Sequence, residues 1–410
     1  MNIIFKNGLL IDGTGDLPLE KASIIIQDGK ITGVGQREAL KIPREVNEIN
    51  CEGKTILPGL IDAHLHLNGW RTNNSLFERN SVPDGVKLLR ASVDAQNLLK
   101  SGFTTVKDCA SLNAIHIKKA IAEGIIQGPR ILVSNFMLSV TGGHGDDEDG
   151  LPLRWAKERN PCICDGIPEC MKAARYALRE GADFIKVASN GAHSKGKFDQ
   201  IEFTLEEIKA IVQVAQNAGT FVSSHAQGNE PIKLAIEGGV KTIDHVFYPD
   251  DDSIEIGIKK DVIFVPTFAI INAFLKSDYV EIAPEWLVKR GRELWENYGK
   301  TIAKIKDFGG VIAMATDYFL GSTIMGTNAI ELEYLVDRAN FTPLEAIKSA
   351  TLGGAKACSL EDKIGTLEEG KIADIIIVNG NPLENIKIMQ NPERIQLVMK
   401  EGNIVVNRGL

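Results

Sequence analysis

The middle of the chain alternates short apolar segments with longer amphipathic ones, and this pattern most constrains the fold. The apolar segments predict β-strands at about 57–63, 103–107, 130–135, 182–188, 220–224, 240–244, 261–265 and 311–315. Amphipathic segments such as VDAQNLLKSG and LEEIKAIVQVAQNAG separate most of them and end in Gly, which is typical of a helix C-cap. Eight strands alternating with helices favour an α/β fold, a (β/α)8 TIM barrel, over an open sheet.

The sequence pattern at both ends of the chain differs from that of the middle. IIFKNGLLI and ASIIIQDGKITGVG near the start, and GKIADIIIVNGNPL and IQLVMKEGNIVVN near the end, are short strands separated by turn dipeptides. We expect the two ends to form one small antiparallel β unit with the long middle inserted into it. The predicted division is residues 1–56 and 360–410 for that unit and 57–359 for the barrel.

Composition excludes several classes of protein. A hydrophobic content of 44% with 24% charged residues is typical of a globular chain and excludes disorder. The formal net charge of −8 provides no basic surface for nucleic acid or an anionic membrane. No uncharged apolar run reaches the roughly 18 residues of a membrane span. The N-terminus has no signal-peptide pattern, and the six cysteines are thinly spread, so we expect reduced thiols and a cytoplasmic location.

Polar residues follow or interrupt the predicted strands where a barrel carries its active site, at the carboxyl ends. They are His64, His66, Lys186, His225, His245 and Asp317. Alternation along a strand puts His64 and His66 on the same side, as binding to one cation requires. A single strand-end histidine is more often structural. Four histidines and an aspartate at matching positions instead predict a metal site.

Lys186 lies inside the apolar segment FIKVA, and a charge buried there is unfavourable unless it is paired or chemically changed. One alternative is a core lysine paired with a carboxylate. The other is a lysine carboxylated by CO2, whose two oxygens bridge two cations. In that arrangement His64, His66 and Asp317 hold one metal ion, and His225 and His245 hold the other.

The strand motif LPGLIDAHLHL and the tail IGTLEEGKIADIIIVNGNPL resemble the amidohydrolase superfamily over nearly the whole chain. The resemblance implies a TIM barrel inserted in a small β-sandwich domain built from both chain ends. GFTTVKDCA, GPRILVS, TGGHGD, GADFIKVASNGA and HAQG are most similar to its metal-dependent dipeptidases and carboxypeptidases, the prolidase-like group. That likeness implies two zinc ions bridged by carboxylated Lys186 and a hydroxide, a small peptide substrate, and a homo-oligomer.

The same likeness assigns His144 and Tyr248 to the substrate, as groups that polarise the scissile carbonyl. Their alternatives are a loop-capping histidine and a packed surface tyrosine. Two cations lower the pKa of a bridging water. Asp317 is expected to take the proton of the bridging hydroxide on attack and return it to the departing amine as general base and acid.

The acidic loop GGHGDDEDG sets Asp146 and Asp147 beside His144. Its carboxylates favour a C-terminal Arg or Lys in the substrate, unless the loop is simply solvated. The principal rival function is cyclic amide hydrolysis, of the dihydroorotase, hydantoinase or imidazolonepropionase type, with the same metals and Asp317. Deamination and a non-catalytic structural role are weaker alternatives.

Overall fold

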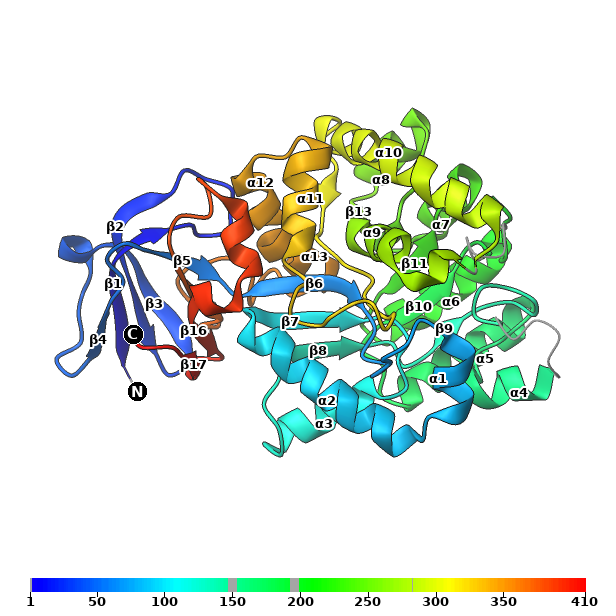
Figure 1. Ribbon diagram of the computed structural model, residues 1–410, viewed down its shortest axis with the longest axis horizontal. Helices are drawn as coiled ribbons and strands as arrows, with labels where there is room; N and C mark the ends of the chain where they lie inside the picture. The colour runs from blue at the N-terminus through cyan, green and yellow to red at the C-terminus, as the bar shows by residue number, and fades with distance from the viewer. Residues whose placement is uncertain (1, 147–152, 192–198, 282) are drawn as a thin grey trace.

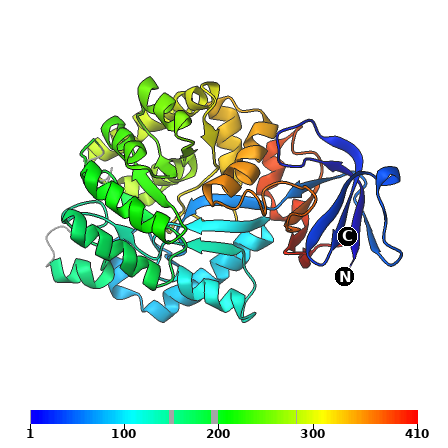
Figure 2. The same cartoon turned by 180° about the vertical axis from the view of Figure 1, so that it is seen from behind.

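The computed structural model describes residues 2–146, 153–191, 199–281 and 283–410. The chain forms an α/β fold in which a sheet built from both ends of the chain stands beside a larger set of parallel strands surrounded by helices (Figure 1). Both termini lie in the sheet-rich part, and the view from behind shows the same arrangement (Figure 2). Within the described ranges, no helix is long and apolar enough to cross a membrane.

The sheet built from both ends has eight strands, in the order β17-β16-β15-β5-β1-β2-β3, with β4 pairing to β1. The sequence predicts an antiparallel unit, but the sheet is mixed because β1 pairs in parallel with β4 and β5. The β5–β15 pair joins the two ends of the chain, and a separate apolar core lies against this sheet. Its strands are β1 (Ile3–Leu10), β2 (Leu19–Gln27), β3 (Lys30–Gln36), β4 (Asn47–Asn50), β5 (Lys54–Pro58), β15 (Ile375–Asn379), β16 (Ile395–Lys400) and β17 (Asn403–Asn407).

The middle of the chain forms two parallel sheets, β6-β7-β8 and β14-β13-β12-β11-β10-β9. Each strand overlaps a segment predicted from the sequence or directly follows one. The strands are β6 (Leu60–Leu65), β7 (Phe103–Asp108), β8 (Arg130–Val133), β9 (Met137–Leu138), β10 (Ile185–Ala188), β11 (Val222–Ala226), β12 (Thr242–His245), β13 (Ile263–Val265) and β14 (Val311–Ile312). The predicted parallel α/β architecture is therefore confirmed.

Helices connect successive parallel strands and cover them, as the amphipathic segments predict (Figure 1). The α-helices are α1 (Ser75–Ser81), α2 (Asp84–Lys100), α3 (Ala114–Ala122), α4 (Leu153–Arg159), α5 (Gly166–Arg179), α6 (Leu205–Asn217), α7 (Asn229–Gly238), α8 (Asp251–Lys259), α9 (Phe268–Lys276), α10 (Glu285–Asp307), α11 (Ile330–Ala339), α12 (Pro343–Lys348) and α13 (Gly354–Ala357). Short helical turns are η1 (Arg37–Ala39), η3 (Asp278–Glu281), η4 (Ser349–Gly353), η5 (Ile386–Gln390) and η6 (Pro392–Arg394).

The two parallel sheets are not one continuous ladder. The strand expected at 130–135 is shorter in the structure: β8 ends at Val133 and β9 starts beyond the predicted segment, at Met137. Asn135 between them adopts a left-handed φ of 59° that interrupts the strand. On the other side, the Ala63 and Asp317 amides donate to the carbonyls of Met314 and His64, at 3.0 and 2.7 Å. Isolated backbone bonds, rather than regular strand pairs, therefore join β6 to the segment that follows β14.

Candidate metal centre

The polar residues predicted at the strand ends converge in the structure. His64 lies in β6 with His66 just beyond it, Lys186 in β10, His225 in β11 and His245 at the end of β12. Asp317 follows β14. Parallel strands of this kind present their carboxyl ends at one edge, which is why residues far apart in sequence meet there.

Asp317 lies among three of the histidines. Its Oδ1 is 3.4 Å from His64 Nε2 and 3.2 Å from His66 Nε2, and its Oδ2 is 3.8 Å from His245 Nδ1. Ligand atoms of His64, His245 and Asp317 all lie within 4.8 Å of one another. This nitrogen and oxygen donor set is one that a divalent transition-metal ion can occupy.

His225 extends the cluster away from Asp317. Its ring centroid lies 4.5 Å from that of His245, and it stacks on His144 at 4.1 Å with an interplanar angle of 22°. His225 is buried, and its Nε2 has no hydrogen-bond partner among the described residues. A buried imidazole nitrogen without such a partner fits a residue whose partner is a metal ion.

Lys186 is almost fully buried, and its Nζ donates to Asp244 Oδ2. The geometry of the described chain is thus that of a core lysine beside a carboxylate, one of the two alternatives open from the sequence. Asp244 is also 3.1 Å from His64 Nδ1, so Lys186 is joined to the histidine cluster through this carboxylate.

Electrostatics favour neutral imidazoles and an ionised carboxylate. Burial lowers the pKa of His64 to about 4 and that of His245 to about 3, and it also holds the pKa of His225 well below its usual range. Burial alone would raise the pKa of Asp317, but the adjacent His64, His66 and His245 hold it below its ordinary value. Neutral imidazoles carry the free lone pair that metal binding requires.

The backbone at two of these strand ends is unusual. His245 has a φ of 77°, Val246 one of 54° and Asp317 one of 53°, all in the left-handed region that non-glycine residues rarely adopt. The Tyr298 hydroxyl donates to the His245 carbonyl, and Thr267 Oγ1 lies 3.0 Å from His245 Nδ1. Such conformations are unfavourable and persist where the surroundings hold them, often at functional sites.

The four predicted substrate residues are placed differently from one another. His144 stacks on His225, and its amide donates to Glu202 Oε1 at 2.6 Å. Tyr248 is half-buried, and its amide donates to the Gln227 carbonyl. Asp146 Oδ2 accepts from the Gly142 amide at 2.9 Å within its own loop. Asp147 lies outside the described residues.

Two aspartates beside the cluster are missing from the residues predicted on sequence alone. Asp244 contacts His64 and Lys186, and Asp62 accepts from the His64 amide at 3.1 Å. The second Asp62 oxygen accepts from the Thr316 hydroxyl and from Asn328 Nδ2, both at 2.7 Å. Each aspartate is one or two residues before a predicted ligand, in IDAHLH and TIDH. That proximity in sequence is the feature by which both aspartates could have been predicted to lie beside the cluster.

Comparison with known proteins agrees with this architecture. Residues 55–405 match the model of the amidohydrolase family. The chain is 33% identical to the ochratoxinase of Aspergillus niger over 99% of its own length and 87% of that protein. The crystal structure of the A. niger enzyme superposes with a TM-score of 0.90 and 30% identity, covering 100% of this chain and 96% of that one.

Two further relatives carry other names. A crystal structure of a Xaa-Pro dipeptidase with bound methionine in its active site superposes with a TM-score of 0.87 and 30% identity, covering 99% and 100% of the two chains. The imidazolonepropionase of Kosmotoga olearia is 26% identical over 93% of this chain and 90% of that protein.

Proposed function

Because the chain belongs to the amidohydrolase family, we propose that it is a two-metal hydrolase that cleaves dipeptides or the C-terminal residue of short peptides. The observation that carries the proposal is the cluster of three buried histidines (His64, His225 and His245) with the partly exposed His66 and Asp317, in which the buried His225 Nε2 has no hydrogen-bond partner among the described residues. The likeness to a Xaa-Pro dipeptidase at 30% identity supports a peptide as substrate.

His64, His66 and Asp317 would hold one divalent ion, and His225 and His245 the other, with carboxylated Lys186 shared between them. Zinc suits this set of imidazole and carboxylate ligands. Such ions, when bound, supply an acidified water and a polarised carbonyl. The neutral imidazoles described above are in the protonation state that this role needs.

The reaction requires proton transfer as well as binding. Asp317 is ionised and lies within 3.4 Å of both His64 and His66, so it is suited to accept a proton during attack. It would then deliver that proton to the departing amine. His144, stacked on His225, would orient the substrate carbonyl. The half-buried Tyr248 would help to polarise the same carbonyl.

The preference for C-terminal Arg or Lys depends on the acidic loop alone. Asp146 already accepts from the Gly142 amide, which supports a role in the turn as well.

Kinetics on Ala-Arg, Ala-Leu and Ala-Pro, with metal content measured on the same preparation, test the proposal. Peptide hydrolysis with two metal ions per chain is expected. A preference for Leu or Pro would contradict the Arg or Lys specificity, and no peptide hydrolysis by metal-loaded protein would contradict the function.

Cyclic amide hydrolysis is the second candidate, because the imidazolonepropionase of Kosmotoga olearia is among the relatives. It would use the same cluster and Asp317. Assaying cyclic imides and imidazolones beside the dipeptides distinguishes the two reactions, since turnover of the cyclic substrates alone would favour this candidate.

The proposal also covers the domain architecture, oligomeric state and location of the protein. The two parallel sheets and the bonds from Ala63 to Met314 and from Asp317 to His64 support a closed (β/α)8 barrel of residues 57–359. A β-sandwich domain of residues 1–56 and 360–410, a homo-oligomeric state and a cytoplasmic location complete the proposal. Analytical ultracentrifugation would measure the oligomeric state.

A further inference from the structure

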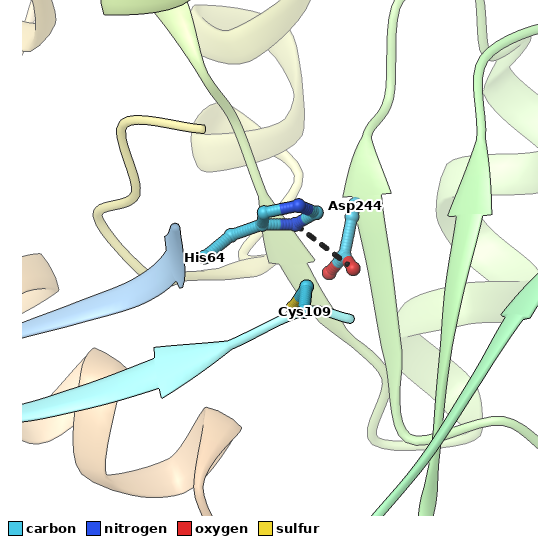
Figure 3. A group of neighbouring side chains, drawn as sticks. All are labelled: His64, Cys109 and Asp244. Carbon is cyan, nitrogen blue, oxygen red and sulfur yellow. Dashed lines mark ion pairs between the residues drawn. The ribbon is translucent and has the colours of Figure 1, made fainter. Parts of the chain in front are cut away.

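Asp244 occupies the centre of a buried polar network beside the proposed metal centre. It is fully buried in β12, directly before His245. Its Oδ2 accepts from Lys186 Nζ and from the Ser223 hydroxyl, the latter at 2.8 Å, and lies 3.1 Å from His64 Nδ1. Figure 3 shows the His64 ring and the Asp244 carboxylate facing each other across this short gap.

A second buried lysine approaches the other oxygen of the same carboxylate. Lys107 in β7 is fully buried, and its Nζ lies 3.8 Å from Asp244 Oδ1. The same ammonium donates to Ser223 Oγ at 3.1 Å and Thr242 Oγ1 at 3.2 Å, and it lies 5.3 Å from the centre of the Phe184 ring. Asp244 is therefore held from two sides by cations on two other strands.

The contact with His64 has a chemical consequence. His64 Nδ1 lies 3.1 Å from Asp244 Oδ2 but does not meet hydrogen-bond geometry with any described residue, so a small rotation of the ring is needed to complete the bond. An ionised carboxylate only accepts hydrogen bonds, and Nδ1 of a neutral His64 must therefore carry the ring proton in that bond. The lone pair is then on Nε2, the atom that faces Asp317 at 3.4 Å. A carboxylate on the far nitrogen fixes the tautomer and orientation of a metal-binding histidine in this way.

Cys109 lies close enough to suggest a different interpretation. Its sulfur, a His64 nitrogen and an Asp244 oxygen lie within 4.8 Å of one another, as a metal site would require (Figure 3). However, the Lys107 ammonium lies beside this carboxylate whether or not Lys186 is carboxylated, and it would repel a further cation there. The geometry favours a positioning carboxylate.

We propose that Asp244, anchored by Lys107, is a positioning residue that fixes the His64 ring with its Nε2 directed to the metal centre. Lys107 has a specific part in this arrangement. If Lys186 is carboxylated, it becomes an anion and no longer neutralises Asp244, whereas Lys107 remains a cation. The inference depends on the proposed function only in taking His64 as a metal ligand.

The test measures zinc binding by the full-length Asp244→Asn variant in competition with a chelator of known affinity. The amide has the same shape but offers N–H groups to Nδ1, which favours the wrong tautomer. A roughly 10- to 100-fold loss of zinc affinity is expected. Asp183→Asn is the matched control, because it removes a carboxylate from another lysine pair, with Lys118, before the start of β10. Wild-type affinity in Asp244→Asn would overturn the inference.

A second measurement needs neither metal nor substrate. Long-range ¹H–¹⁵N spectra of metal-free, histidine-labelled protein report which ring nitrogen of His64 is protonated. Nδ1 is expected in the wild type, because Asp244 is nearer to Nδ1, at 3.1 Å, than Asp317 is to Nε2, at 3.4 Å. Nε2 is expected in Asp244→Asn, where Asp317 is the carboxylate that remains, and an unchanged tautomer would overturn the inference. If Asp244→Asn does not fold, Ser223→Ala, which removes one donor to Oδ2, should weaken zinc binding a few-fold; unchanged affinity there would count against the inference. Protein that binds zinc but hydrolyses no peptide would overturn only the proposed function.

Discussion

At the scale of single residues, Asp244 and His245 are neighbours on β12, yet both approach His64. Strict alternation along a strand would direct them to opposite faces. His245 instead has a φ of 77°, which ends the alternation and lets both side chains reach the cluster. A sequence shows where an aspartate precedes a histidine, but a left-handed non-glycine backbone is imposed by tertiary contacts such as the Tyr298 hydroxyl on the His245 carbonyl. Strand ends alone therefore predict His245 and miss Asp244.

Asp317→Asn should remove most of the activity and leave the fold intact. The amide keeps the shape of the side chain but cannot take up the proton, which is a loss of about 10²–10⁴-fold in kcat. Steady-state kinetics, metal analysis and thermal unfolding on one preparation provide the measurement. A variant with near wild-type kcat and its metal ions bound would refute this role for Asp317.

The metal-free protein should lose stability as the pH falls from about 6.5 to about 4. Burial lowers the pKa of His64 to about 4 and that of His245 to about 3, against 6.5 in the unfolded chain. In this pH range the unfolded state binds protons that the folded state does not, so acidification favours unfolding. The slope is on the order of 1 kcal/mol per pH unit for each histidine.

Urea denaturation of the metal-free protein at a series of pH values would measure this slope. Asp62 acts in the opposite direction, because burial raises its pKa to about 6. A folded-state pKa above the unfolded value favours folding as the pH falls, so the observed slope should be somewhat smaller than the two histidines alone would give. Burial also holds the pKa of Glu331 well above its usual range, which opposes the histidines in the same way as Asp62, so the contribution of His245 is measured as the difference in slope between the wild type and His245→Asn. Equal slopes between pH 6.5 and 4 would show that this imidazole is not buried in neutral form.

At the scale of elements, the carboxylate Glu207 connects two helices that lie side by side. It forms a capping box with Thr204 at the start of α6, and it also accepts from the Gly166 amide at the start of α5, at 2.6 Å. Glu345 forms the same capping box with Thr342 at α12, where it pairs with Lys306 and makes no bond to a second helix start among the described residues. The two capping boxes have the same local motif. They differ in the second partner of the glutamate, which is the Gly166 amide for Glu207 and the Lys306 side chain for Glu345.

Glu207→Ala should therefore destabilise the protein more than Glu345→Ala. We expect about 2–3 kcal/mol for Glu207, which is nearly buried, and about 1 kcal/mol for Glu345. Denaturant unfolding of both variants beside the wild type would measure the two losses. Equal losses would mean that the bond to Gly166 contributes nothing to stability.

Much of the element pattern was predictable, because apolar strands and amphipathic helices leave clear periodicities. The predicted strands at 103–107 and 240–244 lie within one or two residues of β7 and β12. The break between β8 and β9 was not predictable, since Asn135 interrupts the chain there with a left-handed backbone. The parallel pairing of β1 with β5 was also missed, because the alternation of apolar residues indicates where strands lie but not the direction in which they pair.

At the scale of the whole molecule, zinc should stabilise the protein if the cluster binds it. A ligand that binds only the folded state at 100 times its Kd adds about 2.7 kcal/mol to the free energy of unfolding. Thermal unfolding of chelator-treated protein with and without added zinc would show this as a rise in Tm. His225→Asn, which removes one ring of the cluster, should reduce the rise. An equal rise in that variant would place zinc elsewhere.

The pairing of β5 with β15 has a consequence for how the protein is made. The Thr55 hydroxyl donates to the Gly380 carbonyl across 325 residues of sequence. At a synthesis rate of about 5–20 residues per second, the edge of β5 waits roughly 15 to 65 s for its partner strand. During that interval the ribosome-bound chain presents an open, apolar strand edge that invites pairing with other chains. Biogenesis should therefore be the most chaperone-dependent and temperature-sensitive stage in the life of this protein.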